Sequence, residues 1–541
     1  MMKLAHVAAL GIVAIALTVG AGQSSGADLL AEPIPECPDS LYLEYYKNGN
    51  RSRYEKCYSA RRDLMTRLAD AERRERKGRY LPRLVEVIDA ICAMKSWSLP
   101  AHDYGHGCLD GRFMVVELVS SGVARSLTSL AVDPQVALPA ATVAKIRAEV
   151  DRRILAPYLA HVRGKLKVGN WWWCNGKNNW NAVCHANIVR TALDFYPFGN
   201  PHRAEIVRSA VGKMPVFLSG FTDDGYCSEG AGYWNYGFGH FMELAFALRD
   251  APEKIDLLAS AKAKTVARYG FTYWMSPKTS PCFADGSGVP GDWLLKRCAS
   301  VWPDLQHLPL AVRDTFDIAQ VYLLRPGGGR SGLSVGFKGG HNAEFHNHND
   351  LGSYDIALGD VIVSGDPGGE CYTRRTFSSH RYDSKVLNSY AHPVPRVAGR
   401  LQGTGRAFAA KEMRRSFTSA RDTVTLDLTA GYACPALKSL TRTFTYERAT
   451  RRLRVTDSVT FLKPSDFDDP VVTLGVFKDV RKDGFAIVRD GARLEVDVRV
   501  RGARASWDEE VVENPERPSP HLRTLRLKGV RHATVEFIFR P

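Results

Sequence analysis

Hydrophobic residues in the first part of the chain follow a helical period. Between about residues 38 and 320 they recur at steps of three and four positions, in segments separated by loops rich in Gly, Pro, Asn and Trp. This spacing places the apolar side chains on one face of an α-helix. The clearest runs are Leu84 to Met94, Ile188 to Leu193 and Phe241 to Leu248. The pattern predicts stacked helical hairpins.

The pattern changes after about Gly327. Short β-branched runs separated by turn residues follow, at 361–363, 423–428, 453–461 and 533–538. From Leu453 to Phe461 inward and outward positions alternate, which is typical of a half-buried antiparallel strand. The Pro-Gly-Gly-Gly run at 326–329 is the strongest boundary signal. We therefore predict an α+β multidomain protein, with a helical domain at 28–325 and an antiparallel β-sheet domain at 326–541.

Length and charge agree with this division and indicate the kind of partner. A chain of 541 residues exceeds what one core usually supports. The net charge of +15 favours an anionic partner, but the basic residues are scattered and form no nucleic-acid-binding arm. Aromatic faces stack on sugar rings and Arg binds carboxylate or sulfate, so 10 Trp and 21 Tyr favour an acidic polysaccharide over nucleic acid.

The amino end has the pattern of a signal peptide. Lys3 precedes an apolar run from Leu4 to about Val19, and small residues near Ala21 or Ala27 offer cleavage sites. We expect residues 1–27 to be removed and the protein to be exported, to a periplasm or out of the cell. No later run of 18 uninterrupted apolar residues occurs, so we expect no membrane insertion. Eleven cysteines in an exported chain permit disulfides.

The heptapeptide Glu344–Asp350, Glu-Phe-His-Asn-His-Asn-Asp, concentrates the most chemistry. Alternate side chains of a strand share a face, so we expect His346, His348 and Asp350 on one side. Two imidazoles and a carboxylate there can bind a metal ion or move protons, and burying them otherwise is costly. The alternative is a turn held only by hydrogen bonds.

A loop at 169–186 combines tryptophans and asparagines in a way that an ordinary core layer does not. Each buried amide needs partners, whereas indole faces and amides together suit a sugar. The alternative is an Asn-capped helix beginning near Trp180, with tryptophans filling a corner. The candidate ligand-binding residues are Trp172, Asn178, Asn179, Trp180 and Asn181.

A second loop, at 223–240, contains glycines that allow tight bends, followed by two tyrosines. Tyr233 and Tyr236 are expected on one side if a helix has begun there. A tyrosine beside a cation or a desolvated acid can exchange protons. Packing is the alternative role for both, and Glu229 is a further candidate for substrate binding.

Together these segments resemble the heparinase II/III-like polysaccharide lyases and the related dermatan sulfate epimerases. The resemblance rests on sequence elements that occur in order over nearly the whole mature chain. They are Asn178-Asn179-Trp180-Asn181, Glu229-Gly230-Ala231-Gly232-Tyr233-Trp234-Asn235-Tyr236, Phe345-His346-Asn347-His348-Asn349-Asp350, Gly365-Asp366-Pro367-Gly368 and Asn388-Ser389-Tyr390-Ala391-His392-Pro393.

The resemblance implies a fold, an activity and a metal. The fold is an incomplete (α/α) toroid followed by a multi-sheet antiparallel β domain, with an acidic glycan between them. The activity is β-elimination next to a uronic acid, which leaves a 4,5-unsaturated sugar. His348, Asp366 and His392 match a structural metal site whose usual occupant is zinc.

The same resemblance implies roles in catalysis. Asn179 is the neutraliser of the uronate carboxylate, with Asn178 and Asn181 as alternatives. Tyr233 transfers the proton, His346 assists it, and the neighbouring Tyr236 is the other candidate. Several family members have a catalytic histidine where this chain has Trp180, which leaves the direction of proton transfer open.

Other functions are compatible with these residues. A uronyl C5-epimerase uses the same proton abstraction without elimination, and a glycan-binding protein of the same fold needs no catalysis. A metallohydrolase is the third alternative, because His-x-His-x-Asp also occurs in such enzymes, although at other places in their folds. The ultraviolet absorbance of an unsaturated product distinguishes a lyase from all three.

Overall fold

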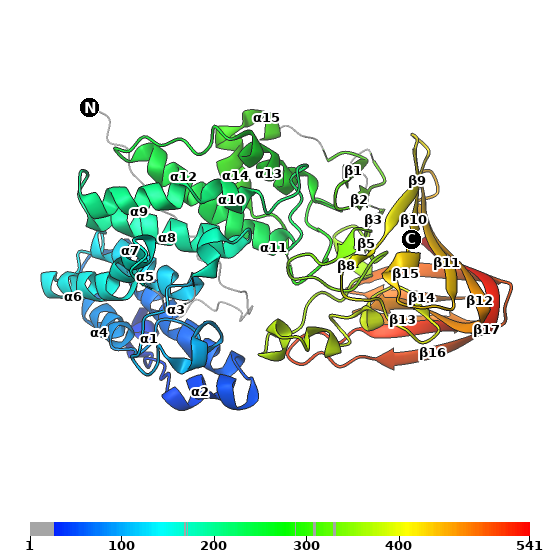
Figure 1. Cartoon of the computed structure of the whole chain (residues 1–541), viewed down its shortest axis with the longest axis horizontal. Coiled ribbons are helices and arrows are strands. Elements are labelled where there is room, and N and C mark those ends of the chain that lie inside the picture. The colour runs from blue at the N-terminus through cyan, green and yellow to red at the C-terminus, as the bar shows by residue number, and fades with distance from the viewer. Residues whose placement is uncertain (1–25, 167–168, 170, 287, 307–309, 328–331) are drawn as a thin grey trace.

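The computed structural model describes residues 26–541 except 167–168, 170, 287, 307–309 and 328–331. A helical half is followed by a half built of antiparallel sheets, as predicted (Figure 1). The signal segment expected at 1–27 lies outside the described residues, apart from the two positions that begin the first helix. No helix of the described residues is both long and apolar enough to span a bilayer.

The helices follow one another through the first half of the chain. They are α1 (Gly26–Ala31), α2 (Asp39–Asn48), α3 (Ser52–Glu75), α4 (Leu81–Cys92), α5 (Leu118–Ala131), α6 (Ala140–Val150), α7 (Ala156–Val162), α8 (Asn179–Phe195), α9 (Pro201–Val211), α10 (Met214–Leu218), α11 (Ala231–Tyr233), α12 (Gly239–Asp250), α13 (Ala261–Thr272), α14 (Asp292–Val301) and α15 (Pro303–Gln306). Two π-helical turns, η3 (Asp151–Leu155) and η5 (Trp234–Phe238), join α6 to α7 and α11 to α12. The three predicted helical runs fall in α4, α8 and α12.

Helix α8 is the central helix of this half. Residues 181–189 are all buried, and the helix packs against α5, α9 and α12. A helix enclosed on every side needs partners for its polar groups. Asn181 supplies some of them, because its amide donates to Gly176 O at 2.8 Å and its oxygens accept from His185 Nδ1. That the helices as a set form an incomplete toroid stays a prediction.

The strands form two large sheets and one small one. A five-stranded sheet has the order β1-β2-β3-β5-β6, with β1 (Arg313–Phe316), β2 (Val321–Leu324), β3 (Leu333–Lys338), β5 (Tyr354–Leu358) and β6 (Val361–Ser364). A ten-stranded sheet contains β7 (Arg396–Val397), β9 (Lys411–Phe417), β10 (Arg421–Asp427), β11 (Leu437–Glu447), β12 (Arg452–Thr473), β13 (Val476–Arg481), β14 (Gly484–Arg489), β15 (Ala492–Arg501), β16 (Ala505–Val511) and β17 (His521–Arg540). The small sheet pairs β4 (His341–Asn342) with β8 (Gly405–Ala409).

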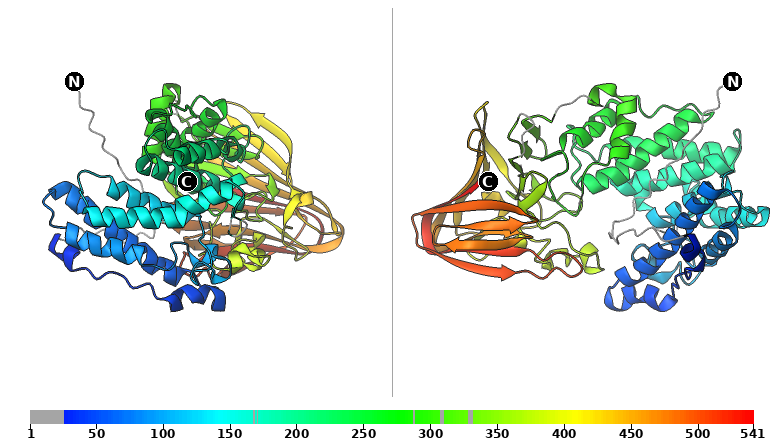
Figure 2. Two further views of the ribbon diagram at one scale, coloured as in Figure 1. Left: turned by 60° about the vertical axis from the view of Figure 1, so that its left-hand side comes forward. Right: turned by 180° about the vertical axis from the view of Figure 1, so that it is seen from behind.

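The five-stranded sheet is the middle layer of the molecule (Figure 2). Along β2, Val321 and Leu323 belong to the core shared with the helices, whereas Tyr322 and Leu324 belong to the core shared with the ten-stranded sheet. Alternate residues of a strand point to opposite faces, so both faces are covered. The sheet therefore packs against the helices on one face and against the ten-stranded sheet on the other.

Strands begin earlier than the boundary expected at 325/326. β1 and β2 precede that point and pair with each other and with β3, so a division there would cut one sheet. Their short runs resemble the apolar runs of buried helices, which explains why the periodicity did not separate them. The position of the domain boundary stays a prediction.

The four strand runs predicted after Gly327 fall in β6, β10, β12 and β17. In β12, residues 453–461 alternate between buried and half-buried positions, as expected. Asp457 occupies one inward position, where its two oxygens accept from Arg442 at 2.9 and 2.7 Å. The paired charge explains a carboxylate in an apolar row.

Candidate active site

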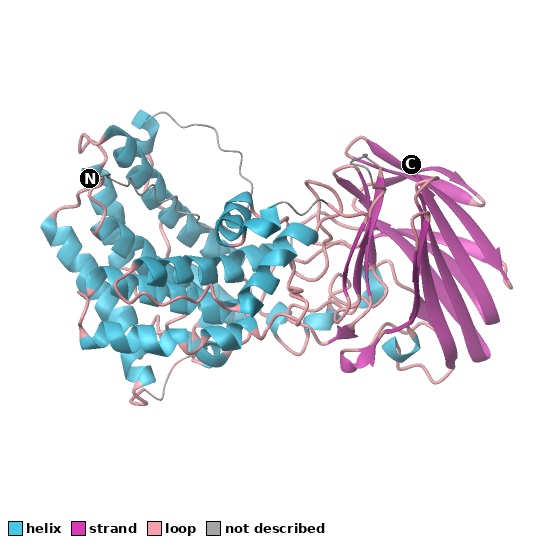
Figure 3. Cartoon of the chain, turned by 90° about the horizontal axis from the view of Figure 1, so that it is seen from above, coloured by secondary structure: helices cyan, strands magenta, loops and turns pink. Residues whose placement is uncertain are grey.

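The candidate site lies where loops of the two halves meet (Figure 3). Its residues come from the beginning of α8, from α11 and from the His346 loop, residues 343–353 between β4 and β5. A further segment, between α13 and α14, contributes Asp285.

The His346 loop is not the strand that the sequence predicted. Residues 343–353 form turns and bends without ladder pairing, and His346 has a left-handed backbone with φ +54. Left-handed φ is uncommon outside glycine and is often held in place at functional sites. Asp350 consequently does not share a face with the histidines: it accepts from Lys338 Nζ at 2.8 Å.

Asp285 holds both histidines of the loop. Its Oδ2 lies 2.7 Å from His346 Nδ1, and its Oδ1 lies 2.9 Å from His348 Nε2. Arg381 donates to both oxygens at 3.0 Å. The carboxylate is fully buried, so these charge-assisted bonds act in a medium of low dielectric. One carboxylate thus fixes the orientation of two imidazoles.

Two glycines allow this arrangement. A Cβ on Gly286 would lie 1.9 Å from Glu229 O, and a Cβ on Gly230, where φ is +90, would lie 3.0 Å from Gly286 Cα. The two loops can therefore approach only without side chains at these positions. Their approach places Glu229 on the other side of His346, with its Oε2 3.4 Å from Nε2.

Tyr233 reaches the same cluster from α11. Its ring stacks on the His346 ring with centroids 4.4 Å apart, and its hydroxyl lies 3.5 Å from His346 Nδ1. The hydroxyl also lies 2.7 Å from that of Tyr372, which in turn donates to Asp285 at 3.1 Å. Protons can thus pass between the phenols, the imidazole and the carboxylate over hydrogen-bond distances.

The surroundings bias each protonation state. Burial raises the pKa of Tyr233, and the charge of Asp285 raises it further, so the phenol is neutral at rest. Burial lowers the pKa of His346, but the bond to Asp285 and the charge of Glu229 outweigh it and the pKa is raised. Burial acts to raise the pKa of Asp285, but bonds from both histidines hold it well below its usual range. The resting cluster favours a charged imidazole beside a neutral phenol.

Asn179 lies close to this cluster. It lines a small pocket together with Lys177, Glu229 and Tyr233, and its Cβ approaches the glycine at 237 in η5. The side chain is buried, yet neither amide atom has a hydrogen-bond partner among the described residues. A buried amide without a partner is costly unless a ligand completes it.

The other residues predicted in this loop have different surroundings. Asn178 caps α8 through a bond from Trp180 N, and Asn181 is bonded inside the helical core, which supports the Asn-capped helix alternative for these two. Trp180 lies beside Trp172, with ring centroids 5.0 Å apart. Trp172 is 47% exposed, so its indole is available to stack on a sugar.

The sequence predicted Tyr233 and Tyr236 on one side of a helix. In the structure the two tyrosines do not share a side. Tyr233 ends α11 and Tyr236 lies inside the π-helical turn η5, whose wider turn rotates position i+3 away from its place in an α-helix. Burial raises the pKa of Tyr236, and Cys184 and Glu117 raise it further. Among the described residues, the tyrosines that bond His346 are Tyr233 and Tyr372, not Tyr236.

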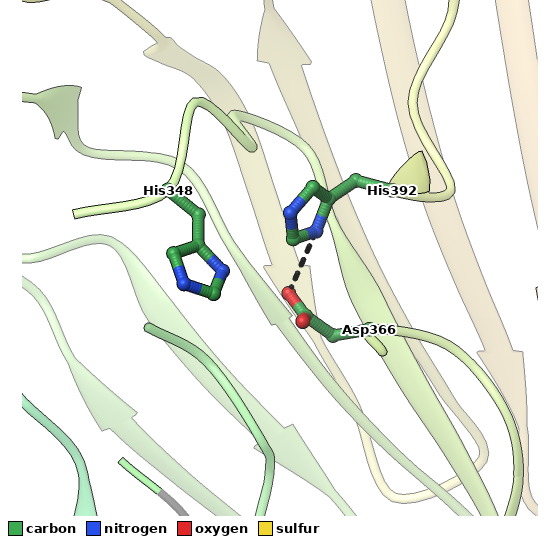
Figure 4. A group of neighbouring side chains, drawn as sticks. All are labelled: His348, Asp366 and His392. Atoms are coloured by element: carbon green, nitrogen blue, oxygen red, sulfur yellow. Dashed lines mark hydrogen bonds and ion pairs between the residues drawn. The ribbon is translucent and has the colours of Figure 1, made fainter. Parts of the chain in front are cut away.

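His348, Asp366 and His392 converge into a group that could hold a metal ion (Figure 4). Their ligand atoms lie within 4.8 Å of one another, and all three residues are buried. His392 Nδ1 lies 3.0 Å from Asp366 Oδ2. This is the metal set that the resemblance implied.

The tautomers of the two imidazoles fit a metal. His348 donates from Nε2 to Asp285, and His392 donates from Nε2 to Val386 O at 2.9 Å. In the neutral form of each ring Nδ1 therefore carries no proton and can bind a cation, with the outer partners fixing the ring. His348 Nδ1 is buried and has no partner within the described chain. Two imidazole nitrogens and a carboxylate oxygen form a donor set typical of transition metals.

The sequence analysis missed Asp285, Tyr372, Arg381 and Lys177. Asp285 belongs to an Asp-Gly-Ser-Gly sequence that resembles an ordinary turn. Its role depends on hydrogen bonds to residues more than 60 positions away. The Asp-Gly pair was the only local signal. Tyr372 and Arg381 lie in the sequence between two predicted metal ligands, Asp366 and His392. That position indicates a loop near the site but predicts no role for either residue.

The eleven cysteines, all within the described residues, are free thiols. Cys174, Cys184 and Cys227 are buried in the helical core. Burial raises the pKa of each thiol. These three residues have a packing role in the structure.

No protein-family model and no curated protein sequence matches the chain. Among solved structures, a heparinase III, the BT4657 gene product, aligns with a TM-score of 0.65 at 12% identity, over 96% of this chain and 84% of that one. The heparan sulfate lyase HepC from Pedobacter heparinus aligns with a TM-score of 0.59 at 12% identity, over 89% of this chain and 76% of that one. The chain therefore has the heparinase-like polysaccharide lyase fold.

Proposed function

We propose that the protein is an exported lyase that cleaves an acidic polysaccharide next to a uronic acid by β-elimination. The observation that carries the proposal is the unpartnered amide of Asn179 in the same pocket as Tyr233, with His346 stacked on that tyrosine. Three segments far apart in the chain supply the groups that this reaction needs.

The reaction removes the proton at C5 of the uronate, forms the C4–C5 double bond and breaks the bond from C4 to the bridging oxygen, which takes up a proton. Negative charge grows on the C5 carboxylate as the proton leaves. An amide N–H from Asn179 stabilises that charge. The exposed ammonium of Lys177, at the same pocket, adds attraction for the carboxylate.

Tyr233 is the proton-transfer group in this proposal. Its neutral phenol suits donation to the bridging oxygen, and the charged imidazole of His346 supports it. Abstraction at C5 requires the phenol to lose its own proton first. His346 can take that proton only as a neutral imidazole, and the Tyr372 hydroxyl, at hydrogen-bond distance, can pass it on. Asp285 keeps both of those groups in place.

We further propose zinc as the occupant of the group formed by His348, Asp366 and His392. The ion would act as a structural cross-link that ties the His346 loop to the two segments that follow β6. Asp285 contacts both His348 and His346, so order at the metal ligand is transmitted to the histidine beside Tyr233.

HepC is named as a heparan sulfate lyase, but this chain is only 12–14% identical to HepC and to the heparinase III. The proposal therefore extends to uronic-acid polysaccharides as a class. A uronyl C5-epimerase would use the same Asn179 and Tyr233 and release no unsaturated product.

A panel of uronic-acid polysaccharides tests the proposal, with ultraviolet absorbance and product mass as readouts. Tyr233→Phe removes one hydroxyl, and we expect turnover to fall about a hundredfold or more with substrate binding retained. Tyr236→Phe is the matched control: the Tyr233 hydroxyl bonds Tyr372 and His346, whereas no such bond of the Tyr236 hydroxyl occurs among the described residues, so its loss should matter little. Normal rates for Tyr233→Phe on a polymer that wild type cleaves would refute the mechanism. Inversion at C5 without absorbance would replace the lyase by an epimerase.

A further inference from the structure

His102 is a histidine of the helical half to which no role has been assigned. It ends the short 3-10 helix η1 (Pro100–His102). Its Nδ1 lies 2.7 Å from Glu117 Oε2, and the Glu117 carboxylate is fully buried. The same carboxylate accepts from Val119 N and Ser120 N at the beginning of α5, so it is held rigidly. The bond to Glu117 therefore fixes the orientation of the imidazole.

The pairing determines which nitrogen is free. A carboxylate acceptor at Nδ1 keeps the proton on that atom and leaves Nε2 as the outward nitrogen. Nε2 has no hydrogen-bond partner in the described part of the chain and is not sealed from solvent. The side chain is 13% exposed, so one oriented nitrogen is presented at the surface.

The His102 ring lies beside the tryptophans that are candidates for sugar binding. The His102 ring meets the Trp180 indole edge-on, with centroids 4.7 Å apart, and Trp180 neighbours the exposed Trp172. Trp180 directly follows Asn179 at the beginning of α8. His102, Trp180 and Trp172 thus form a continuous row that begins next to the proposed neutralising amide.

The loop of His102 also borders the other half of the molecule. The Tyr46 hydroxyl donates to Pro100 O at 2.8 Å and to Asp103 O at 2.6 Å, which ties the loop to α2. The Tyr46 carbonyl accepts from Arg374 Nη1 at 2.9 Å, and Arg374 belongs to the segment that carries Tyr372. The loop of His102 is therefore linked both to the beginning of α8, through Trp180, and to the segment that carries Tyr372, through Tyr46.

We propose that His102 is a substrate-contacting residue, whose Nε2 binds a polar or acidic group of the sugar that stacks on Trp180 and Trp172. The inference rests on the proposed function and deepens it, because it assigns a polar contact to a sugar beside the scissile uronate. Stacking on indoles tolerates many sugars, whereas an oriented nitrogen selects for a hydrogen-bonding group at one position. In this proposal His102 helps to determine which sugar binds at that position.

Two substitutions separate contact through Nε2 from support of Glu117. His102→Asn retains an amide near the position of Nδ1, so it keeps the bond to Glu117 and deletes the outward nitrogen. His102→Gln places its amide near the position of Nε2 and keeps the reach toward a sugar. His106→Asn is the matched control, because His106 lies in the same loop and pairs with Asp110 at 2.9 Å but is 41% exposed.

The measurement is the affinity of each variant, in a Tyr233→Phe background, for heparan sulfate, chondroitin, alginate and glucuronan fragments. We expect His102→Asn to weaken binding about tenfold or more, His102→Gln to bind within about threefold of the parent, and the control to be unchanged. In otherwise wild-type enzyme, His102→Asn should raise KM more than it lowers kcat.

The possible outcomes distinguish the role of His102 from the lyase proposal. Parent-like binding by His102→Asn, or weaker binding by His102→Gln than by His102→Asn, overturns the role of His102. If the wild-type protein binds fragments but does not cleave them, the lyase proposal is refuted. The comparison of the His102 variants remains valid in that case. Absence of both binding and cleavage on all four polymers would overturn both proposals.

Discussion

Replacing Asp285 by Asn tests whether one carboxylate organises both the proton-transfer cluster and the metal group. The substitution keeps size and shape but removes a fully buried charge. It also turns one acceptor oxygen into an N–H donor. In one orientation of the amide the new N–H faces the donors His346 and Tyr372, and in the other it faces the donor His348. Arg381 donates to both positions, so the N–H meets another donor in either orientation.

The structure sets the magnitude of the expected effect. Asp285 accepts charge-assisted bonds of 2.7, 2.9 and 3.0 Å from two histidines and an arginine. Breaking a buried charge pair from one side costs about 3–5 kcal/mol, because the remaining charge is left without a partner. We expect a comparable loss of folding free energy, and a fall in turnover of about a hundredfold or more as His346 loses its orientation and its raised pKa.

The assay combines three measurements on one protein preparation. Thermal melting reports stability, metal analysis reports the group at His348, and product absorbance reports turnover. Loss of an outer partner typically weakens metal binding about 10–100-fold, so metal content should fall on dialysis. Asp490→Asn is the matched control, because its carboxylate is 72% exposed and faces Arg489 on the surface.

Near-normal melting, metal content and turnover in Asp285→Asn would refute this reasoning. A loss of turnover alone would show that Asp285 serves His346 but not the metal group. A loss of metal with normal turnover would separate the two sites, contrary to the bridging geometry.

Two further predictions concern the metal and the pH dependence of stability. Purified protein should contain about one equivalent of zinc, and His348→Ala should lose metal and thermal stability together while the exposed His532→Ala does not; metal-free protein with full activity would contradict the site. Burial raises the pKa of Glu344 from 4.5 to about 7, so the folded state should lose stability as pH rises from about 4.5 to 7, by at most about 3 kcal/mol. Glu344→Gln should remove that slope in unfolding experiments at several pH values, and an unchanged slope would show that Glu344 is not its source.

Several features of the protein followed from the sequence without the structure. The change from a helical to a two-residue period is a local property of the backbone, and it predicted the helices α4, α8 and α12 and the strands β6, β10, β12 and β17. The order of short motifs led to the fold and to the grouping of His348, Asp366 and His392. Local periods and motif order survive tertiary folding, because they express which face of each element is buried.

The tertiary structure alone decided how the chemical groups face one another. Asp285 gained its role from loops that meet only where Gly230 and Gly286 lack side chains. The π-helical turn after Tyr233 directed Tyr236 away from it, and the His346 loop formed turns where alternation suggested a strand. Contacts between segments far apart depend on loop conformation and on packing from both sides, and neither leaves a period in the sequence.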